Sequence, residues 1–95
     1  MKVYLPTPLR PYADNRSSVD VSGATVAEAM RQLIAEHPQL KGYIYSDDGN
    51  VRGFVNIYLN DEDVRYLPNK INSSAKDSDT LTIMPSIAGG SYRRK

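Results

Sequence analysis

One strongly amphipathic segment, residues 23–38, constrains the fold more than any other part of the chain. Its sequence is GATVAEAMRQLIAEHP, in which Thr25 and, three residues later, Glu28 form the capping-box pattern that begins a helix. Its larger apolar side chains recur at helical spacing on one face: Val26, Met30, Leu33 and Ile34. His37 and Pro38 end the helix, where an imidazolium is favoured by the helix dipole. The segment therefore predicts one helix whose apolar face must pack against other elements.

Two short segments before the helix alternate between apolar and polar residues, which predicts β-strands. The first is KVYLPTPL, which alternates from Lys2 to Leu5; the prolines that follow confine it to a sheet edge or end it early. A turn or loop, PYADNRSS, comes next, and residues 18–21 alternate again. Because the two segments are close in sequence, they predict a hairpin.

Three more strands are predicted after the helix. Residues 54–59 alternate, Asn60, Asp61 and Glu62 turn the chain, and residues 64–66 return as the second strand of a hairpin. The segment LPNKINSSAKDSD then favours a loop with one short helical turn. The last strand is DTLTIMP, in which alternate apolar residues point to one side.

The order β-β-α-β-β-β predicts an α+β fold, with the helix packed across one face of a mixed sheet of about five strands. The right-handed crossover rule makes the first and last strands parallel neighbours in the middle of that sheet, which is the β-grasp, the architecture of ubiquitin. The predicted core consists of the inward-facing side chains: Val3, Leu5, Val19, Val21, Val26, Met30, Leu33, Ile34, Val55, Ile57, Leu59, Leu81 and Ile83. We predict a β-grasp domain over residues 1–86 and a tail over residues 87–95, since SIAGGSYRRK shows no periodicity.

The composition excludes several function classes. The chain has 95 residues, enough for one domain, and its 12 basic and 11 acidic side chains give a net charge of +1. That balance offers no general electrostatic case for nucleic acid or an anionic membrane as a partner. No apolar run approaches the roughly 20 residues of a membrane span, and the first residues lack the apolar run of a signal peptide. We therefore expect a cytoplasmic protein.

Catalytic and metal-binding groups are sparse. The chain has no cysteine and one histidine, His37, which excludes disulfides, thiolate catalysis and most histidine-ligated metal sites. The acidic turn at residues 47–50 lacks the closing glutamate of a calcium loop, because Tyr58 stands at that position. The consecutive acids Asp61, Glu62 and Asp63 predict a solvated turn and not an acid–base pair. The sequence thus predicts a protein that is not an enzyme and that binds no metal.

Three stretches carry a resemblance to a known family: LRP at 9–11, FVNIYLNDEDVRYL at 54–67 and DTLTIMPSIAGG at 79–90. Together with the order of elements, they make the chain similar to the ThiS/MoaD family of ubiquitin-like sulfur carriers, and within it to the CysO-type carriers of cysteine biosynthesis. The resemblance covers residues 2–90, and the run at 54–67 is its most specific part. A di-glycine alone is a weak signal, because short glycine tails also provide flexibility.

The resemblance implies a chemistry at the terminal glycine of the carrier. An E1-like adenylyltransferase/sulfurtransferase uses ATP to adenylate the carboxylate, and sulfur then replaces the adenylate to give a thiocarboxylate. In the CysO-type pathway the thiocarboxylate attacks an aminoacrylate on a pyridoxal-phosphate-dependent cysteine synthase, and a JAMM-type zinc metalloprotease releases the new cysteine. The carrier itself binds no cofactor. Cysteine is the favoured product, while thiazole and molybdopterin stay open.

Four residues of the tail acquire roles from this resemblance. Ile87, Ala88 and Gly89 form the narrow segment that enters a partner's channel, and Gly90 reacts; a glycine has no Cβ to collide with the channel walls. Working members of the family end in Gly-Gly, whereas here SYRRK follows, so the resemblance implies a precursor cut between Gly90 and Ser91. Two alternatives stay open: residues 91–95 derive from an expression vector, or the tail is permanent and the carrier chemistry has been lost.

A candidate partner surface lies on the side of the strands away from the core. Phe54, Tyr58 and Met84 point there and form a predicted apolar patch facing the E1-like partner, with Arg65 as a further contact. The alternative is an ordinary scatter of apolar residues on a surface with no partner.

Two other function classes remain open. A ubiquitin-like protein modifier, joined through Gly90 to lysines of target proteins, would use the same adenylated glycine. A β-grasp interaction domain would have no C-terminal chemistry and would tolerate Gly89→Ala and Gly90→Ala. The sequence leaves the oligomeric state open as well.

Overall fold

The computed structural model describes residues 1–85, in which the strands follow the predicted order and several short helical turns are added. The strands are β1 (Lys2–Tyr4), β2 (Ser18–Asp20), β3 (Val55–Leu59), β4 (Glu62–Asp63) and β5 (Thr80–Pro85). The α-helices of this range are α1 (Val26–Glu36) and α2 (Lys41–Ile44), and the 3-10 turns are η1 (Thr7–Ala13), η2 (Pro38–Leu40), η3 (Val64–Tyr66) and η4 (Lys70–Asn72). The predicted tail, residues 87–95, lies outside the described residues.

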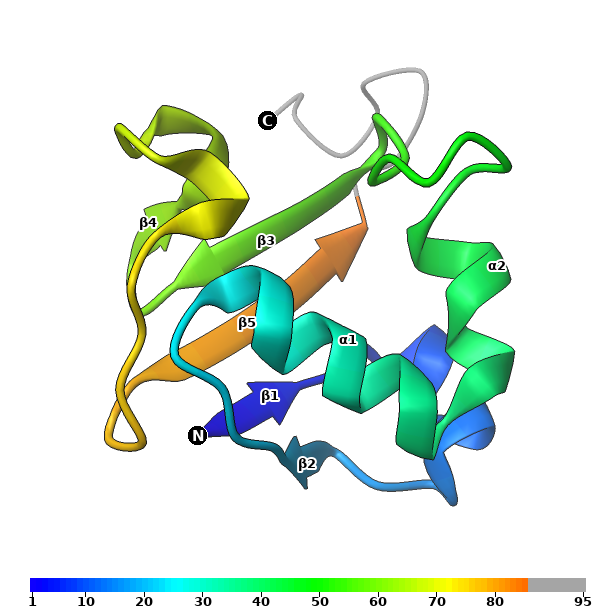
Figure 1. The fold of residues 1–95 in the computed structure, drawn as a ribbon. Helices are drawn as coiled ribbons and strands as arrows, with labels where there is room; N and C mark the ends of the chain where they lie inside the picture. The colour runs from blue at the N-terminus through cyan, green and yellow to red at the C-terminus, as the bar shows by residue number, and fades with distance from the viewer. Residues whose placement is uncertain (86–95) are drawn as a thin grey trace, which may run out of the picture.

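The sheet has five strands in the order β2-β1-β5-β3-β4, and α1 crosses one of its faces (Figure 1). β1 and β5 are parallel neighbours in the centre, with Val3 opposite Leu81. The pairs β1–β2, β5–β3 and β3–β4 are antiparallel. This topology confirms the predicted β-grasp, including the central parallel pair.

The start of α1 is fixed by the predicted capping residues. The Thr25 hydroxyl accepts the backbone N–H of Glu28 at 3.1 Å, as in a capping box. The Glu28 carboxylate reaches back to the backbone N–H of Ala24 at 2.8 Å, one residue earlier than the usual pattern. The backbone of Ala75 also donates to the Ala24 carbonyl at 2.9 Å, which ties the segment before β5 to the beginning of the helix.

The core lies between α1 and the sheet and contains all the predicted side chains, although Ile34 and Leu59 are only partly buried. Further buried apolar residues come from positions that the sequence pattern does not indicate: Met1, Leu9, Ala13, Ala29, Leu40, Ile44, Val64 and Ala75. Leu40 and Ile44, in η2 and α2, are fully buried. Burial of each such side chain contributes about 1.5–3 kcal/mol before conformational entropy is subtracted, so this second helical segment is a substantial part of the fold.

The predicted return strand at residues 64–66 is wrong. β4 contains only Glu62 and Asp63, and the next three residues form the 3-10 turn η3. The Asp63 carboxylate accepts the backbone N–H of Arg65 at 2.9 Å and so caps this turn. Val64, the first residue of this turn, is buried. Asn60, with φ 57°, makes the hairpin turn itself.

The first connection also differs from the prediction. The prolines do end β1 early, at Tyr4, but β1 lies in the centre of the sheet and not at an edge. Residues 7–13, with Pro8 at the start, form η1 in place of the predicted loop. Leu9 and Ala13 of this turn are buried, and that burial explains why the segment adopts a regular conformation.

Candidate functional site

The centre of the candidate site is the point where the chain leaves β5. β5 pairs with β1 over Thr80–Thr82 and with β3 over Leu81–Pro85, so its last described residue, Pro85, is held opposite Val55. Gly90 follows five residues later, and five residues span at most about 18 Å when extended. The chain therefore leaves the described fold at one defined end of the central strand, five residues before Gly90.

The site residues predicted in the tail lie outside the described residues. They are Ile87, Ala88, Gly89, Gly90 and Ser91, and their roles in channel entry, reaction and processing stay predictions. The predicted partner surface, in contrast, falls within residues 1–85, so its geometry can be described.

The outer face of the sheet, on the side away from α1, carries two of the three predicted apolar residues. Met84 is 41% exposed and Tyr58 is half-buried on this face. Phe54, which precedes β3 and is 48% exposed, instead lines a groove at the end of β5 together with Leu9 and Tyr12. Tyr4 of β1 joins Met84 and Tyr58, because Tyr4 and Tyr58 stand on either side of Thr82 in the strand register. The alternation of β1 placed Tyr4 on this side, but only the pairing of β1 with β5 shows that it lies beside the predicted patch.

Arg65 lies at the edge of this outer face and is held there by Asp63. Its guanidinium donates to the two Asp63 carboxylate oxygens at 3.2 and 2.8 Å, and also to the Asn56 side-chain oxygen. The Arg65 side chain hydrogen-bonds the carboxylate and lowers the pKa of Asp63, which is itself 9% exposed. Asp63 in turn raises the pKa of Arg65. The predicted contact residue is thus a fixed positive charge beside Tyr58, although half of its side chain remains exposed.

A groove opens at the end of β5 and was not indicated by the sequence. We call it the β5-end groove; its volume is about 460 Å³, and its lining includes Leu9, Tyr12, Tyr43, Phe54, Ile83 and Pro85. Tyr12 from η1 and Tyr43 from α2 hydrogen-bond through their hydroxyls at 2.6 Å, and their ring centroids lie 4.6 Å apart. This hydrogen bond raises the pKa of Tyr12. The sequence signal was weak, because the lining residues come from four separate segments.

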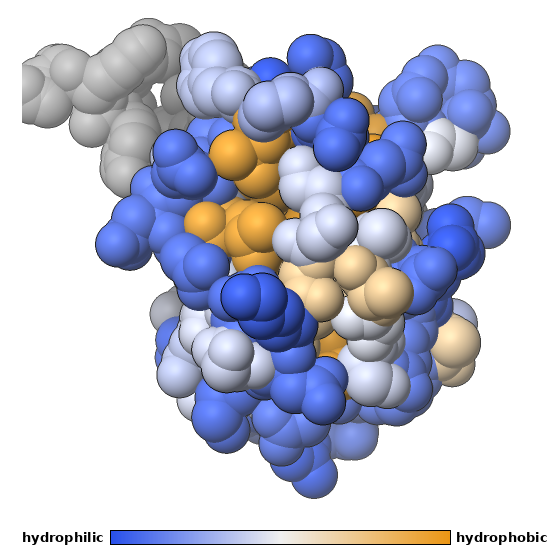
Figure 2. Space-filling model, turned by 60° about the vertical axis from the view of Figure 1, so that its left-hand side comes forward, coloured by the Kyte–Doolittle hydropathy of each residue, from blue (hydrophilic) through white to orange (hydrophobic). Residues whose placement is uncertain are grey.

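A second cavity, of about 280 Å³, lies between β3, the η3–η4 segment and the loop at residues 45–51. Its lining is mainly apolar and includes Val51, Ile57, Val64 and Ile71. Burial raises the pKa of Tyr45 in its wall, an effect that Arg31 of α1 opposes. Figure 2 brings β4 and the η3–η4 segment toward the viewer. On this side, apolar side chains form limited areas surrounded by hydrophilic ones. The cavity offers no pair of acids for catalysis among the residues that line it.

The acidic and histidine positions have structural roles. Asp48 accepts hydrogen bonds from the Ser46 hydroxyl and the Asn50 backbone, and the first of these lowers the pKa of Asp48. His37 is the C-terminal cap of α1, where its backbone N–H donates to the Leu33 carbonyl at 2.9 Å. Within residues 1–85, no three potential ligand side chains lie close enough together to hold a metal ion. No helix in the same range has the length and apolar character needed to cross a membrane.

Comparison with known families fits this geometry. The model described as the ThiS family matches residues 3–90, a range that includes all five strands except the first residue of β1, and also the di-glycine. The chain belongs to the ThiS family. The resemblance inferred from residues 54–67 and 79–90 is thereby confirmed.

Individual relatives of this ThiS-family chain carry two kinds of name. The sulfur carrier protein CysO of Mycobacterium tuberculosis is 38% identical over 90 residues, which cover 93% of this chain and 96% of that protein. The small archaeal modifier protein 1 of Haloferax volcanii is 32% identical over 73 residues, or 76% of this chain and 78% of that protein. The crystal structure of the Amycolatopsis orientalis BexX/CysO complex matches with a TM-score of 0.83 and 38% identity, covering 94% of this chain and 98% of that one.

Proposed function

We propose that this ThiS-family chain is a sulfur carrier in which the Gly90 carboxylate, once exposed, is converted to a thiocarboxylate. The observation that carries the proposal is the placement of Gly89-Gly90 five residues beyond the anchored end of a central strand. A reacting group on such a tether can enter another protein's active site while the folded body stays outside. Similarity to the CysO carriers over more than nine-tenths of the chain supports the same role.

The chemistry begins with processing. Water hydrolyses the Gly90–Ser91 peptide bond, so that Gly90 gains a free carboxylate and Ser91–Lys95 leave with a new amino group. We assign this step to a JAMM-type zinc metalloprotease. Gly89 and Gly90 have no side chains, which leaves the scissile backbone open to a narrow active site.

Activation and sulfur transfer follow. The Gly90 carboxylate attacks the α-phosphorus of ATP on an E1-like enzyme, and pyrophosphate leaves. A sulfide equivalent, supplied with that enzyme, then attacks the acyl adenylate and displaces AMP, which leaves the thiocarboxylate. In this scheme ATP binds the activating partner and the carrier binds no cofactor. The carrier is thus a substrate of its partners and not an enzyme, and we place the reactions in the cytoplasm.

The outer face is the surface that we assign to the activating enzyme. Tyr4, Tyr58 and Met84 supply exposed or half-exposed apolar area on it, and Arg65 supplies a fixed charge at its edge. Such a mixture of aromatic side chains, methionine and arginine is typical of protein interfaces. The structure of the Amycolatopsis orientalis BexX/CysO complex is consistent with partner binding by carriers of this type.

We further propose cysteine as the product, formed when the thiocarboxylate sulfur adds to an aminoacrylate on a pyridoxal-phosphate-dependent cysteine synthase. The sulfur forms a bond to the β-carbon of the aminoacrylate, which gains a proton at its α-carbon. An acyl shift from sulfur to the amino group leaves cysteine in a peptide bond to Gly90, and the metalloprotease hydrolyses that bond. The support is the similarity to proteins named CysO.

The second candidate function is protein modification, favoured by the similarity to the small archaeal modifier protein 1. In that case a lysine amine of a target protein displaces AMP from the Gly90 adenylate and forms an isopeptide bond. The two functions share the activation step and differ in the product, which is a thiocarboxylate at Gly90 for the carrier and an isopeptide bond to a lysine for the modifier.

The test uses two forms of the chain, residues 1–90 and residues 1–95, each incubated with the activating enzyme from the same organism, ATP and sulfide. We expect a thiocarboxylate on residues 1–90, and on residues 1–95 only after the metalloprotease is added. The variant Gly90→Ala of the shorter form is the matched control and should stay unloaded. Either of two results would overturn the proposal. One is a thiocarboxylate on uncut residues 1–95; the other is none on residues 1–90 when the same enzyme preparation is active on a known carrier protein.

A further inference from the structure

The β5-end groove is an apolar surface next to the point where the tail begins. Pro85, the last residue of β5, forms part of its wall, and Tyr12, Tyr43 and Phe54 contribute aromatic rings. Tyr43 is 45% exposed and Phe54 48% exposed, so much aromatic area remains in contact with water. Covering this area with another apolar side chain would release that water and would be favourable.

We propose that Tyr92, in the segment that follows the di-glycine, binds in the β5-end groove while the chain is uncut. Six residues separate Pro85 from Tyr92, a length common in connections that reverse the chain direction. Gly89 and Gly90 lie within these six residues, and glycine adopts at little cost the positive φ values that tight reversals need. The segment starts at the wall of the groove, so the loop that must close is short.

The chemistry of the groove fits a tyrosine side chain. One of the Tyr12 and Tyr43 hydroxyls donates to the other, which leaves the second hydroxyl proton and further lone pairs for an arriving phenol. A tyrosine ring also packs well in offset or edge-on contact with the surrounding aromatic rings. Ile87 is the competing apolar residue of the tail, but it has no group that could use the hydroxyl pair.

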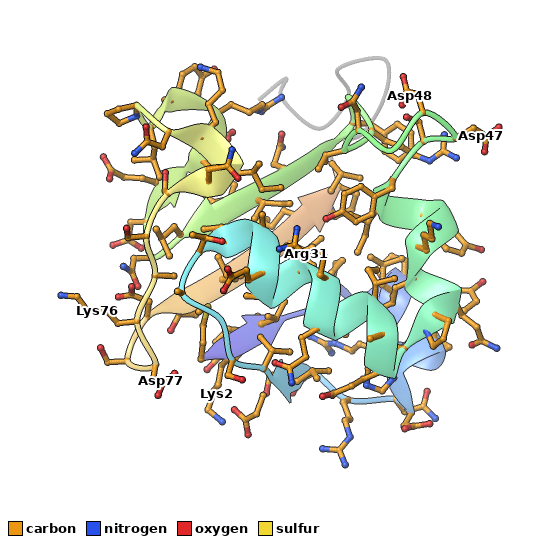
Figure 3. The ribbon with its side chains drawn as sticks, viewed as in Figure 1. Lys2, Arg31, Asp47, Asp48, Lys76 and Asp77 are labelled. Atoms are coloured by element: carbon orange, nitrogen blue, oxygen red, sulfur yellow. The ribbon has the colours of Figure 1, made fainter. Side chains whose placement is uncertain are left out.

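The charges favour the same occupant. Arg93, Arg94 and Lys95 follow Tyr92 directly, and removing these three cations takes the net charge of the chain from +1 to −2. Asp47 and Asp48 project from the loop after α2, at the end of the molecule toward which β5 runs (Figure 3). Neither is in an ion pair with another residue of the range 1–85. Arg52 and Lys41 lie in the same region, so the charge contribution is secondary to the apolar contact.

The consequence for processing rests on the proposed function, although the binding itself does not. With Tyr92 in the groove, Phe54 is covered, and Phe54 belongs to the predicted partner surface. Cutting after Gly90 removes the occupant together with its charges.

The experiment uses tryptophan fluorescence, because the chain contains no tryptophan. Phe54→Trp places a single reporter in the groove wall, and Tyr4→Trp places one of similar exposure on the outer face. We expect the emission of the Phe54→Trp chain to lie at shorter wavelength in residues 1–95 than in residues 1–90. Adding Tyr92→Ala to the longer form should abolish this difference, and the Tyr4→Trp pair should show none.

The proposal is overturned by equal emission from the two Phe54→Trp forms, or by a difference in emission that survives Tyr92→Ala. A groove signal that is present in both forms and lost with Ile87→Ala would assign the groove to Ile87 and would also overturn it. The unsubstituted chain gives an independent check, since nuclear Overhauser effects are expected between the Tyr92 ring and the Leu9 methyl groups. Their absence, with identical Leu9 chemical shifts in the two forms, would contradict docking whether or not the carrier chemistry is found.

Discussion

Replacing Arg65 by alanine should destabilise the fold through Asp63. The substitution removes both side-chain hydrogen bonds to the Asp63 carboxylate, which keeps only the backbone N–H at position 65. A hydrogen bond to a buried charged group contributes about 1.5–3 kcal/mol, whereas an exposed ion pair contributes about 0.2–1 kcal/mol. Asp63 is 9% exposed and the Arg65 side chain 51%, so the pair lies between these cases. We expect Arg65→Ala to lower the free energy of unfolding by about 1–2 kcal/mol at neutral pH.

The effect should depend on pH in a defined direction. Arg65 lowers the pKa of Asp63 in the folded state below its ordinary value of 3.8. A lowered folded-state pKa contributes stability that is fully present above the unfolded-state pKa and is lost as the pH falls through the folded-state pKa. The difference between the wild type and Arg65→Ala should therefore be constant from pH 7 to about pH 5 and should shrink below pH 3.8.

The assay is urea unfolding followed by circular dichroism at pH 7, 5, 3.5 and about 2.5, with the linear extrapolation method. Lys2→Ala is the matched control, because it breaks an ion pair with Asp20 at 3.8 Å in which both side chains are mostly exposed. Its effect should stay below about 0.5 kcal/mol at every pH. Two results would refute the assigned role of the Asp63–Arg65 pair. One is a loss of unfolding free energy for Arg65→Ala no larger than that for Lys2→Ala; the other is a loss for Arg65→Ala that stays the same below pH 3.8.

Three further predictions concern the face, the tail and the packing. Met84→Ala should raise the KM of the activating enzyme for the carrier about three- to eightfold with little change in stability, because the 41% exposed fraction of a side chain worth about 1.5–3 kcal/mol is available for burial. Ile34→Ala, on the helix side, should leave this KM unchanged. An unchanged KM for Met84→Ala would argue against the outer face as the binding surface. The double variant Gly89→Ala/Gly90→Ala, made in the form that ends at residue 90, should yield no thiocarboxylate by mass spectrometry, whereas normal loading would favour an interaction domain. Gly23→Ala should destabilise the fold by about 1–3 kcal/mol in urea unfolding, because the added Cβ would lie 2.7 Å from the backbone nitrogen of Ala29 in α1. An unchanged midpoint of unfolding would contradict this close contact between residue 23 and α1.

The parts of the fold that could be predicted from sequence are those with a local signal. Thr25 and Glu28 mark the beginning of α1 because capping depends on residues three apart. The alternation in β3 and β5 separates buried from exposed side chains, and the structure buries Ile57 and Ile83 as expected. The family resemblance also rested on contiguous runs, and the match over residues 3–90 agrees with it.

The parts that could not be predicted depend on contacts between distant segments. Leu40 and Ile44 are buried because η2 packs against α1 and η1, with α2 beside η2. Two apolar residues in a turn-rich stretch show no recognisable period. The prediction of the return strand was wrong for a local reason. Val64 has high β-propensity, yet the Asp63 carboxylate accepts the backbone N–H of Arg65 and so caps a 3-10 turn.

In the candidate site, too, some residues have a local sequence signal and others are brought together only by contacts between distant segments. Tyr58 and Met84 could be placed on the outer face from alternation alone, because each lies in one predicted strand. Phe54 precedes β3 and lines the β5-end groove, which alternation did not indicate. Tyr4 joins Tyr58 and Met84 only through the pairing of β1 with β5. The β5-end groove is less accessible still, since the Tyr12–Tyr43 contact joins residues 31 positions apart.

The most direct test of the carrier function is the intact mass of the protein recovered from its native cells under conditions that preserve thiocarboxylates. The account predicts a species whose last residue is Gly90 and whose mass exceeds that of the carboxylate form by the difference between one sulfur and one oxygen atom. Alkylation with iodoacetamide should add one group to that species, because the chain has no cysteine to compete. If every recovered species retains Ser91–Lys95 in cells that contain the active protease and activating enzyme, the account is contradicted.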